Sequence, residues 1–266
     1  MNKEGSSHML ITRDAEYQFF SIGTKTYKCY CVTYKDKAVL IDTGASVDRS
    51  TIESNLEKDF IFDIDAIIVT HSHGDSAGNA EYFSMLYNCP VYCVKTSIEL
   101  VKHGVSRLPP KDHPYMKKVG SAASLMLKLP SFIPYEGCQN VKPLTKDVVE
   151  ELLGKDAQLL MTPGHTEDSI SIAIRDVALI GDCAQFKRRV LAPIFVDNES
   201  QMAASWESLI RLKCKYYLSG HGRPWNADDW LNQTEYKDEV DEDAVDFEEE
   251  TPDTKEPDSK EDESKS

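Results

Sequence analysis

Apolar runs of four to eight residues alternate with polar turns along most of the chain, a pattern that predicts strands interleaved with helices. Residues 27–34 and 38–41 flank the turn at 35–37 and predict a β-hairpin. The further elements predicted in the first half are a helix over 47–60, a strand over 64–70, a helix over 79–87, a strand over 91–94 and a helix after Ser97.

The second half shows the same alternation after a stretch that is hard to interpret. Pro109-Pro110 breaks any helix there, and residues 116–129 have a pattern compatible with another helix. Short elements of mostly strand character are expected over 144–153, 158–161, 169–174 and 177–180, followed by a helix over 200–212 and a strand over 216–218. No internal repeat of fixed short period is visible, so an α/β fold is expected.

Charge divides the chain into a body and a tail. The net charge is −15, but residues 235–266 contain 16 acidic and 4 basic residues and account for −12 of it. This segment has very few aromatic residues and cannot bury enough apolar surface to order itself. We therefore expect an N-terminal extension over 1–16, a globular domain over 17–232 and a disordered acidic tail over 233–266.

The near-neutral body limits the partners that the chain is expected to have. It lacks the basic excess that nucleic-acid binding requires, and no run approaches the ~18 apolar residues of a membrane span. The first twenty residues lack the apolar core of a secretory signal. We expect a cytoplasmic protein with a small-molecule substrate, no nucleic-acid partner and no membrane partner. The seven cysteines are expected to be unpaired thiols.

One apolar run leads directly into a loop rich in metal-binding side chains. Residues 66–69 suit a buried strand, and the loop that follows carries His71, His73 and Asp75. Side chains two residues apart on an extended segment point to the same side, so the two imidazoles can converge on one ion. A single His-x-His pair is common and is compatible with an exposed polar loop.

Three later runs repeat this arrangement, and their agreement favours a metal site. Each apolar run ends in a short loop in which a glycine directly precedes one potential ligand. The three potential ligands are His165, Asp182 and His221.

Taken together, these strand-end motifs resemble those of the metallo-β-lactamase fold family. The matching motifs, in the family's order, are Asp42-Thr43-Gly44, His71-x-His73-x-Asp75, Pro163-Gly164-His165-Thr166, Gly181-Asp182 and Gly220-His221-Gly222. The resemblance covers about residues 17–230 and implies a four-layer αββα sandwich with the site at one edge between two sheets. It implies a first metal held by His71, His73 and His165, a second held by Asp75 and His221, and a bridging Asp182. Asp75 and Asp182 would also be the catalytic residues.

One position departs from the commonest family pattern. Most hydrolases of the family have a second-site histidine directly after the aspartate, where this chain has Ser76. The number of ions, one or two, therefore stays open. Cys183 is a further ligand candidate, although core packing is the more ordinary role of a cysteine beside an aspartate on a strand. Thr70, Thr166 and Asp42 are candidates for hydrogen bonds that orient the imidazoles, with turn and capping roles as the alternative.

Imidazole and carboxylate ligands favour zinc, with iron or manganese as alternatives. By the resemblance, the leading hypothesis is a hydrolase in which a metal-bound hydroxide attacks an ester, thioester, lactone or amide of a small molecule. The alternatives are an iron-dependent oxygenase of sulfur substrates with the same fold, and a non-catalytic interaction protein that acts through the acidic tail.

Overall fold

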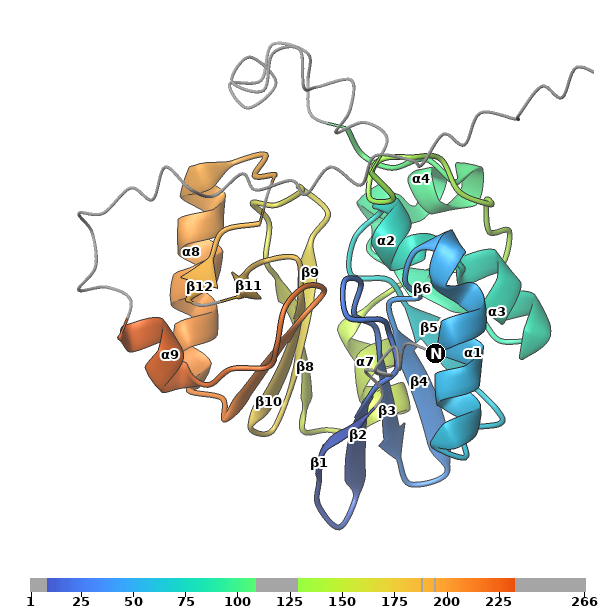
Figure 1. The fold of residues 1–266 in the computed structure, drawn as a ribbon, viewed down its shortest axis with the longest axis horizontal. Coiled ribbons are helices and arrows are strands. Elements are labelled where there is room, and N and C mark those ends of the chain that lie inside the picture. Colours follow the sequence, from blue (N-terminus) through green and yellow to red (C-terminus); the bar gives the residue numbers. More distant parts are fainter. Residues whose placement is uncertain (1–8, 109–128, 188, 194, 233–266) are drawn as a thin grey trace, which may run out of the picture. The chain divides into compact units, whose positions relative to one another are not determined.

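Two β-sheets form the centre of the molecule in the computed structural model, which describes residues 9–108, 129–187, 189–193 and 195–232 (Figure 1). The larger sheet has seven strands that are neighbours in sequence order. They are β1 (Met9–Arg13), β2 (Tyr17–Ser21), β3 (Tyr30–Tyr34), β4 (Lys37–Ile41), β5 (Ala66–Ile68), β6 (Val91–Cys93) and β7 (Val141–Pro143). Strands β1 to β4 pair antiparallel, whereas β4 to β7 pair parallel.

The smaller sheet has four strands in the order β13-β10-β9-β8. They are β8 (Ala157–Met161), β9 (Ile170–Ile174), β10 (Val177–Gly181) and β13 (Tyr216–Ser219), while β11 (Gln185–Phe186) and β12 (Val190–Leu191) form a separate ribbon. Because β10 and β13 are parallel neighbours, their carboxyl ends lie at the same edge of the sheet. The two loops that begin there are therefore adjacent.

Helices cover the outer face of each sheet (Figure 1). The described helices are the short 3₁₀ turns Ser46–Asp48 and Lys95–Ser97, together with α1 (Arg49–Lys58), α2 (Gly74–Ala77), α3 (Ala80–Leu86), α4 (Ile98–His103), α7 (Lys146–Leu153), α8 (Glu199–Leu212) and α9 (Ala227–Leu231). Ile52 of α1 and Phe83 of α3 pack against the larger sheet, and Leu209 of α8 and Trp230 of α9 pack against the smaller one.

The inner faces of the two sheets share one apolar core. Val32 and Ile68 of the larger sheet are in the same buried cluster as Ile172 and Leu179 of the smaller sheet. The alternate residues of β10, Ala178 and Ile180, point to the opposite face of the sheet and belong to the buried cluster beneath α8. The order of layers is helix, sheet, sheet, helix, which confirms the predicted αββα sandwich.

The strand prediction for residues 144–153 is wrong, because most of this segment forms helix α7. Thr145 caps the helix by accepting a hydrogen bond from the backbone N–H of Val148 on its side chain. Val149, Leu152 and Leu153 are buried at helical spacing, and they close the core between the sheets. The helix expected over 116–129 lies, except for residue 129, outside the described residues.

The first strand lies within the segment expected as an N-terminal extension. Met9–Arg13 pairs with β2 and so belongs to the larger sheet. The tail expected over 233–266 lies outside the described residues and stays a prediction. Among the residues that the structure describes, none of the helices has the length and apolar character needed to cross a membrane.

Candidate metal centre

All six ligand candidates converge at the edge where the two sheets meet. His71, His73 and Asp75 follow β5 in the larger sheet. His165 lies between β8 and β9, Asp182 follows β10, and His221 follows β13, so the smaller sheet supplies the other three. Each sheet therefore contributes half of the cluster.

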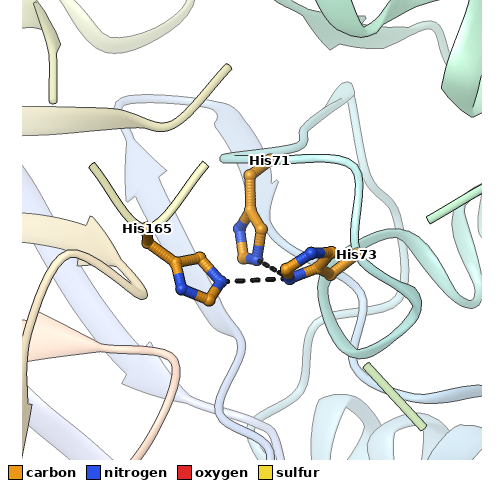
Figure 2. A group of neighbouring side chains, drawn as sticks. All are labelled: His71, His73 and His165. Atoms are coloured by element: carbon orange, nitrogen blue, oxygen red, sulfur yellow. Dashed lines mark hydrogen bonds between the residues drawn. The ribbon is translucent and has the colours of Figure 1, made fainter. Parts of the chain in front are cut away.

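Three imidazoles point towards one another in the cluster (Figure 2). His71 Nε2 lies 3.1 Å from His73 Nδ1, and His165 Nε2 lies 3.0 Å from the same atom. None of the three residues is more than 4% exposed. The three inner nitrogens thus surround one point.

Backbone carbonyls decide which nitrogen of His73 and His165 carries the proton. His73 Nε2 donates to the carbonyl oxygen of Arg107 at 2.8 Å, and His165 Nδ1 donates to the carbonyl oxygen of Phe195 at 2.7 Å. A neutral imidazole has only one N–H, so the inner nitrogens of both rings carry lone pairs.

A hydroxyl and a buried carboxyl group fix the third ring. Thr70 Oγ1 donates to Asp42 Oδ2 at 2.8 Å, so it accepts from His71 Nδ1 at 3.1 Å. Asp42 also accepts from the backbone N–H of Thr70 at 2.7 Å, with its own backbone at φ 61°. His71 Nε2 therefore also presents a lone pair to the centre.

This proton assignment makes the trio a good fit for a cation. His73 Nδ1 lies about 3 Å from the lone-pair nitrogens of both other rings, and these nitrogens repel one another because no proton is available for the two short contacts drawn in Figure 2. A cation among them removes the repulsion, and imidazole nitrogens are ligands of zinc, iron and other transition metals.

Two carboxylates approach the inner nitrogens of the histidines. Asp182 Oδ2 is 3.7 Å from His71 Nε2, 3.6 Å from His165 Nε2 and 3.2 Å from His221 Nε2. Asp75 Oδ2 is 3.4 Å from His221 Nε2, and Asp75 Oδ1 is buried without a hydrogen-bond partner among the described residues. Ligand atoms of His71, Asp75 and Asp182 also lie within 4.8 Å of one another.

Burial and charge set the protonation of these groups. Burial, helped by the neighbouring imidazoles, lowers the pKa of His73 and of His165 to about 4, so both rings are neutral ligands at pH 7. Burial opposes the charge of His221, but the carboxylates of Asp182 and Asp75 outweigh it and raise its pKa well above the usual value. In the metal-free chain His221 is therefore the cation that offsets the two carboxylates.

Glycine at position 220 is required by the position of Asp182. A Cβ atom on Gly220 would collide with Asp182 Oδ1, and a Cβ atom on Gly181 would come within 2.6 Å of Thr70 Oγ1. These two glycines let the loops after β10 and β13 pack against each other and against the loop after β5.

Of three further positions noted in the sequence, one contacts the cluster and two do not. Ser76 Oγ lies 3.3 Å from His71 Nδ1, on the outer side of that ring. Cys183 is directed away from the cluster, with its thiol 3.8 Å from the sulfur of Met202 in the core beneath α8. Thr166 bonds to Ser169 within its own turn.

Three residues that orient the imidazoles were not predicted. Arg107, Phe195 and Thr26 act through their backbone carbonyls, the last accepting from His221 Nδ1 at 2.9 Å. Every residue has a carbonyl, so no side-chain pattern distinguishes them. Ser131, whose hydroxyl donates to Asp75 Oδ2 at 2.5 Å, is likewise a common residue type with no motif around it.

Comparison with known proteins agrees with this geometry. The sequence model described as the metallo-β-lactamase superfamily matches residues 24–221. A probable metallo-hydrolase of Methanocaldococcus jannaschii is 30% identical over 146 residues, which make up 55% of this chain and 62% of that protein. The chain thus matches less than two thirds of that relative's length. A metallo-β-lactamase fold-containing protein of Sulfurisphaera tokodaii is 27% identical, with 79% of each chain covered.

Solved structures show the same fold. The crystal structure of an archaeal metallo-β-lactamase superfamily protein from Sulfolobus tokodaii superposes with a TM-score of 0.60 at 21% identity, covering 81% of this chain and 83% of that one. The metallo-β-lactamase SMB-1, bound to 2-mercaptoethanesulfonate, gives a TM-score of 0.59 at 19% identity and covers 76% of each chain. At these identities the likeness concerns the fold alone.

Proposed function

Because the chain belongs to the metallo-β-lactamase superfamily, we propose that it is a zinc-dependent hydrolase that cleaves an ester, thioester, lactone or amide of a small molecule. The observation that carries this proposal is the proton assignment of the histidines. Each imidazole donates its outer N–H to a fixed acceptor, and the inner nitrogens meet two buried carboxylates.

The residues divide into two sets that share one oxygen atom. His71, His73 and His165 would hold one ion, and Asp75 and His221 would hold another. Asp182 Oδ2 lies within 3.7 Å of nitrogens from both sets, so it would contribute to both ions. This arrangement supports a two-ion centre in spite of Ser76.

A divalent cation in such a site lowers the pKa of a coordinated water from ~15.7 towards ~7. The chain's own contribution is to orient that water and to move its proton. Asp75 Oδ2 is held by Ser131, which leaves the buried Oδ1 free to accept a hydrogen bond or a proton. Asp75 is therefore our candidate for the general base.

Metal content and hydrolysis together test the proposal. We expect purified protein, reconstituted with zinc, to retain about two zinc ions per chain and to hydrolyse at least one member of a panel of small esters, thioesters and lactones. His71→Ala and Asp182→Ala should each reduce zinc content and lower activity by at least a hundredfold. Lys187→Ala, an exposed change that leaves all six ligands intact, serves as the control.

Other outcomes would contradict this function. A single iron per chain would favour the sulfur-substrate oxygenase, and protein that takes up no metal would favour a non-catalytic binding role. Hydrolysis that persists unchanged in His71→Ala would show that the activity does not arise at this centre.

A further inference from the structure

Asp168 is a fully buried carboxylate that is not among the six ligand candidates. Its side chain has no solvent exposure, and it lies three residues after His165 in the turn between β8 and β9. It is not part of the groups of described residues whose ligand atoms come together. Burying a carboxylate costs free energy unless it is paired and hydrogen-bonded, so the contacts of Asp168 should indicate its role.

One oxygen of Asp168 holds the loop that carries the first two histidines. Asp168 Oδ2 accepts a hydrogen bond from the backbone N–H of Ser72 at 3.1 Å. Ser72 lies between His71 and His73, so this bond fixes the backbone from which both imidazoles project. The same oxygen accepts from Ser97 Oγ at 2.6 Å, which anchors it to the end of the 3₁₀ turn before α4.

The other oxygen faces the residue that orients His73. Asp168 Oδ1 lies 3.4 Å from Arg107 Nε. The guanidinium of Arg107 also pairs with Glu167 at 3.0 Å, and its backbone carbonyl accepts the N–H of His73. Asp168 is therefore connected to all three histidines. It lies in the same turn as His165, it binds the Ser72 amide between His71 and His73, and it pairs with Arg107, whose carbonyl binds His73.

The electrostatic balance shows that Asp168 is an anion. Burial would raise the pKa of this carboxyl, but the hydrogen bond from Ser97 and the other donors outweigh it and lower the pKa to about 2. Replacing a buried ion pair with apolar residues is often neutral or stabilising. Stability alone is thus a weak reason for a charged group at this position.

We infer that Asp168 is the positioning residue of the first metal site, holding the loops of His71, His73 and His165 in the spacing that a metal ion requires. The inference rests on the metal binding proposed above. Changing a group that orients metal ligands typically lowers metal affinity 10- to 100-fold. A carboxylate that only supports the fold would lower stability without affecting affinity in this way.

The test measures the zinc dissociation constant of the full chain by competition with a chromophoric chelator, together with the Tm of the metal-free protein. We expect Asp168→Ala to weaken zinc binding 10- to 100-fold. Asp168→Asn keeps an oxygen for Ser72 but lacks the charge, so it should weaken binding about fivefold. Tyr17→Phe is the control, because it removes a buried hydrogen bond to the Leu153 carbonyl without touching any ligand loop.

The cobalt(II) absorption spectrum adds a readout of ligand geometry. In both Asp168 variants the visible bands should shift or weaken, whereas Tyr17→Phe should keep the wild-type spectrum at a lower Tm. Zinc affinity within twofold of wild type and an unchanged cobalt spectrum in Asp168→Asn would overturn the inference, even if Asp168→Ala does not fold. Wild-type protein that binds no zinc would instead contradict the proposed function.

Discussion

At the scale of single residues, the centre depends on which nitrogen of each imidazole points outward and donates a proton. The outer nitrogens of His73, His165 and His221 donate to backbone carbonyls, and that of His71 donates to Thr70. These bonds use the outer nitrogens only, so they orient the inner nitrogens towards the centre. Pre-orientation of this kind reduces the entropy that binding would otherwise cost.

In the metal-free protein, the histidines of the centre should lower the stability on both sides of pH 6.5. The folded pKa of about 4 for His73 and His165 lies below the ~6.5 of an unfolded histidine, so the stability they contribute is present above pH 6.5. It is lost as the pH falls from 6.5 towards 4, by up to about 3 kcal/mol for each ring. The raised pKa of His221 acts in the opposite sense, because its contribution is lost as the pH rises above 6.5.

Thermal unfolding of chelator-treated protein from pH 4 to pH 9 measures the loss of stability on both the acid and the alkaline side. His221→Gln should reduce the loss on the alkaline side, to which the raised pKa of Asp42 also contributes, and keep the loss on the acid side. A stability curve that rises steadily from pH 6.5 to pH 9 in the wild type would contradict this protonation scheme.

At this scale the sequence indicates the six ligand candidates but not the groups that orient them. The six ligand candidates are chemically distinctive, and each follows a strand that its apolar run reveals. Asp168 and Ser131 are ordinary residue types in loops, and the carbonyls of Arg107 and Phe195 become acceptors only because tertiary structure brings them to the rings. Such contacts depend on packing between distant segments.

At the scale of elements, strand alternation was easier to recognise than a short buried helix. The predicted hairpin, the strands over 91–94 and 216–218, and the helix over 200–212 all correspond to elements of the structure. Helix α7 was missed because it has only eight residues and carries four apolar side chains in two adjacent pairs, Val148-Val149 and Leu152-Leu153. Apolar runs of this length fit both types of element.

The cap of α7 can be tested directly. Thr145→Ala removes the side-chain acceptor of the Val148 N–H and should lower the free energy of unfolding by about 1 kcal/mol. Thr145→Ser keeps the hydroxyl and should recover most of that loss. Urea denaturation monitored by circular dichroism measures both values. Equal stability of Thr145→Ala and the wild type would show that the cap is not needed.

At the scale of the whole molecule, the two sheets are joined at both the core and the site. Their inner faces share one apolar cluster, and the Thr70 carbonyl accepts from the Ile170 N–H at 3.0 Å beside the metal ligands. Tyr30 of the larger sheet donates its hydroxyl to the Ser219 carbonyl of the smaller sheet at 2.6 Å. Metal binding should therefore stabilise the domain as a whole.

Zinc at a thousandfold excess over its dissociation constant should add about 4 kcal/mol of stability. For a domain of this size the corresponding rise in Tm is about 10 °C. Differential scanning calorimetry with and without zinc measures the shift. His71→Ala should show little of it, and an equal shift in that variant would place the stabilising ion elsewhere.

The even division of the ligands between the sheets has a kinetic consequence. An ion held by His71 and His73 from one sheet and by His165 from the other would be a removable cross-link that closes a loop of more than ninety residues. The two sheets could not separate while that cross-link remained. The lifetime of the folded state against proteolysis would then be set by how slowly the ion leaves, and a chelator would shorten it without altering a single contact in the core.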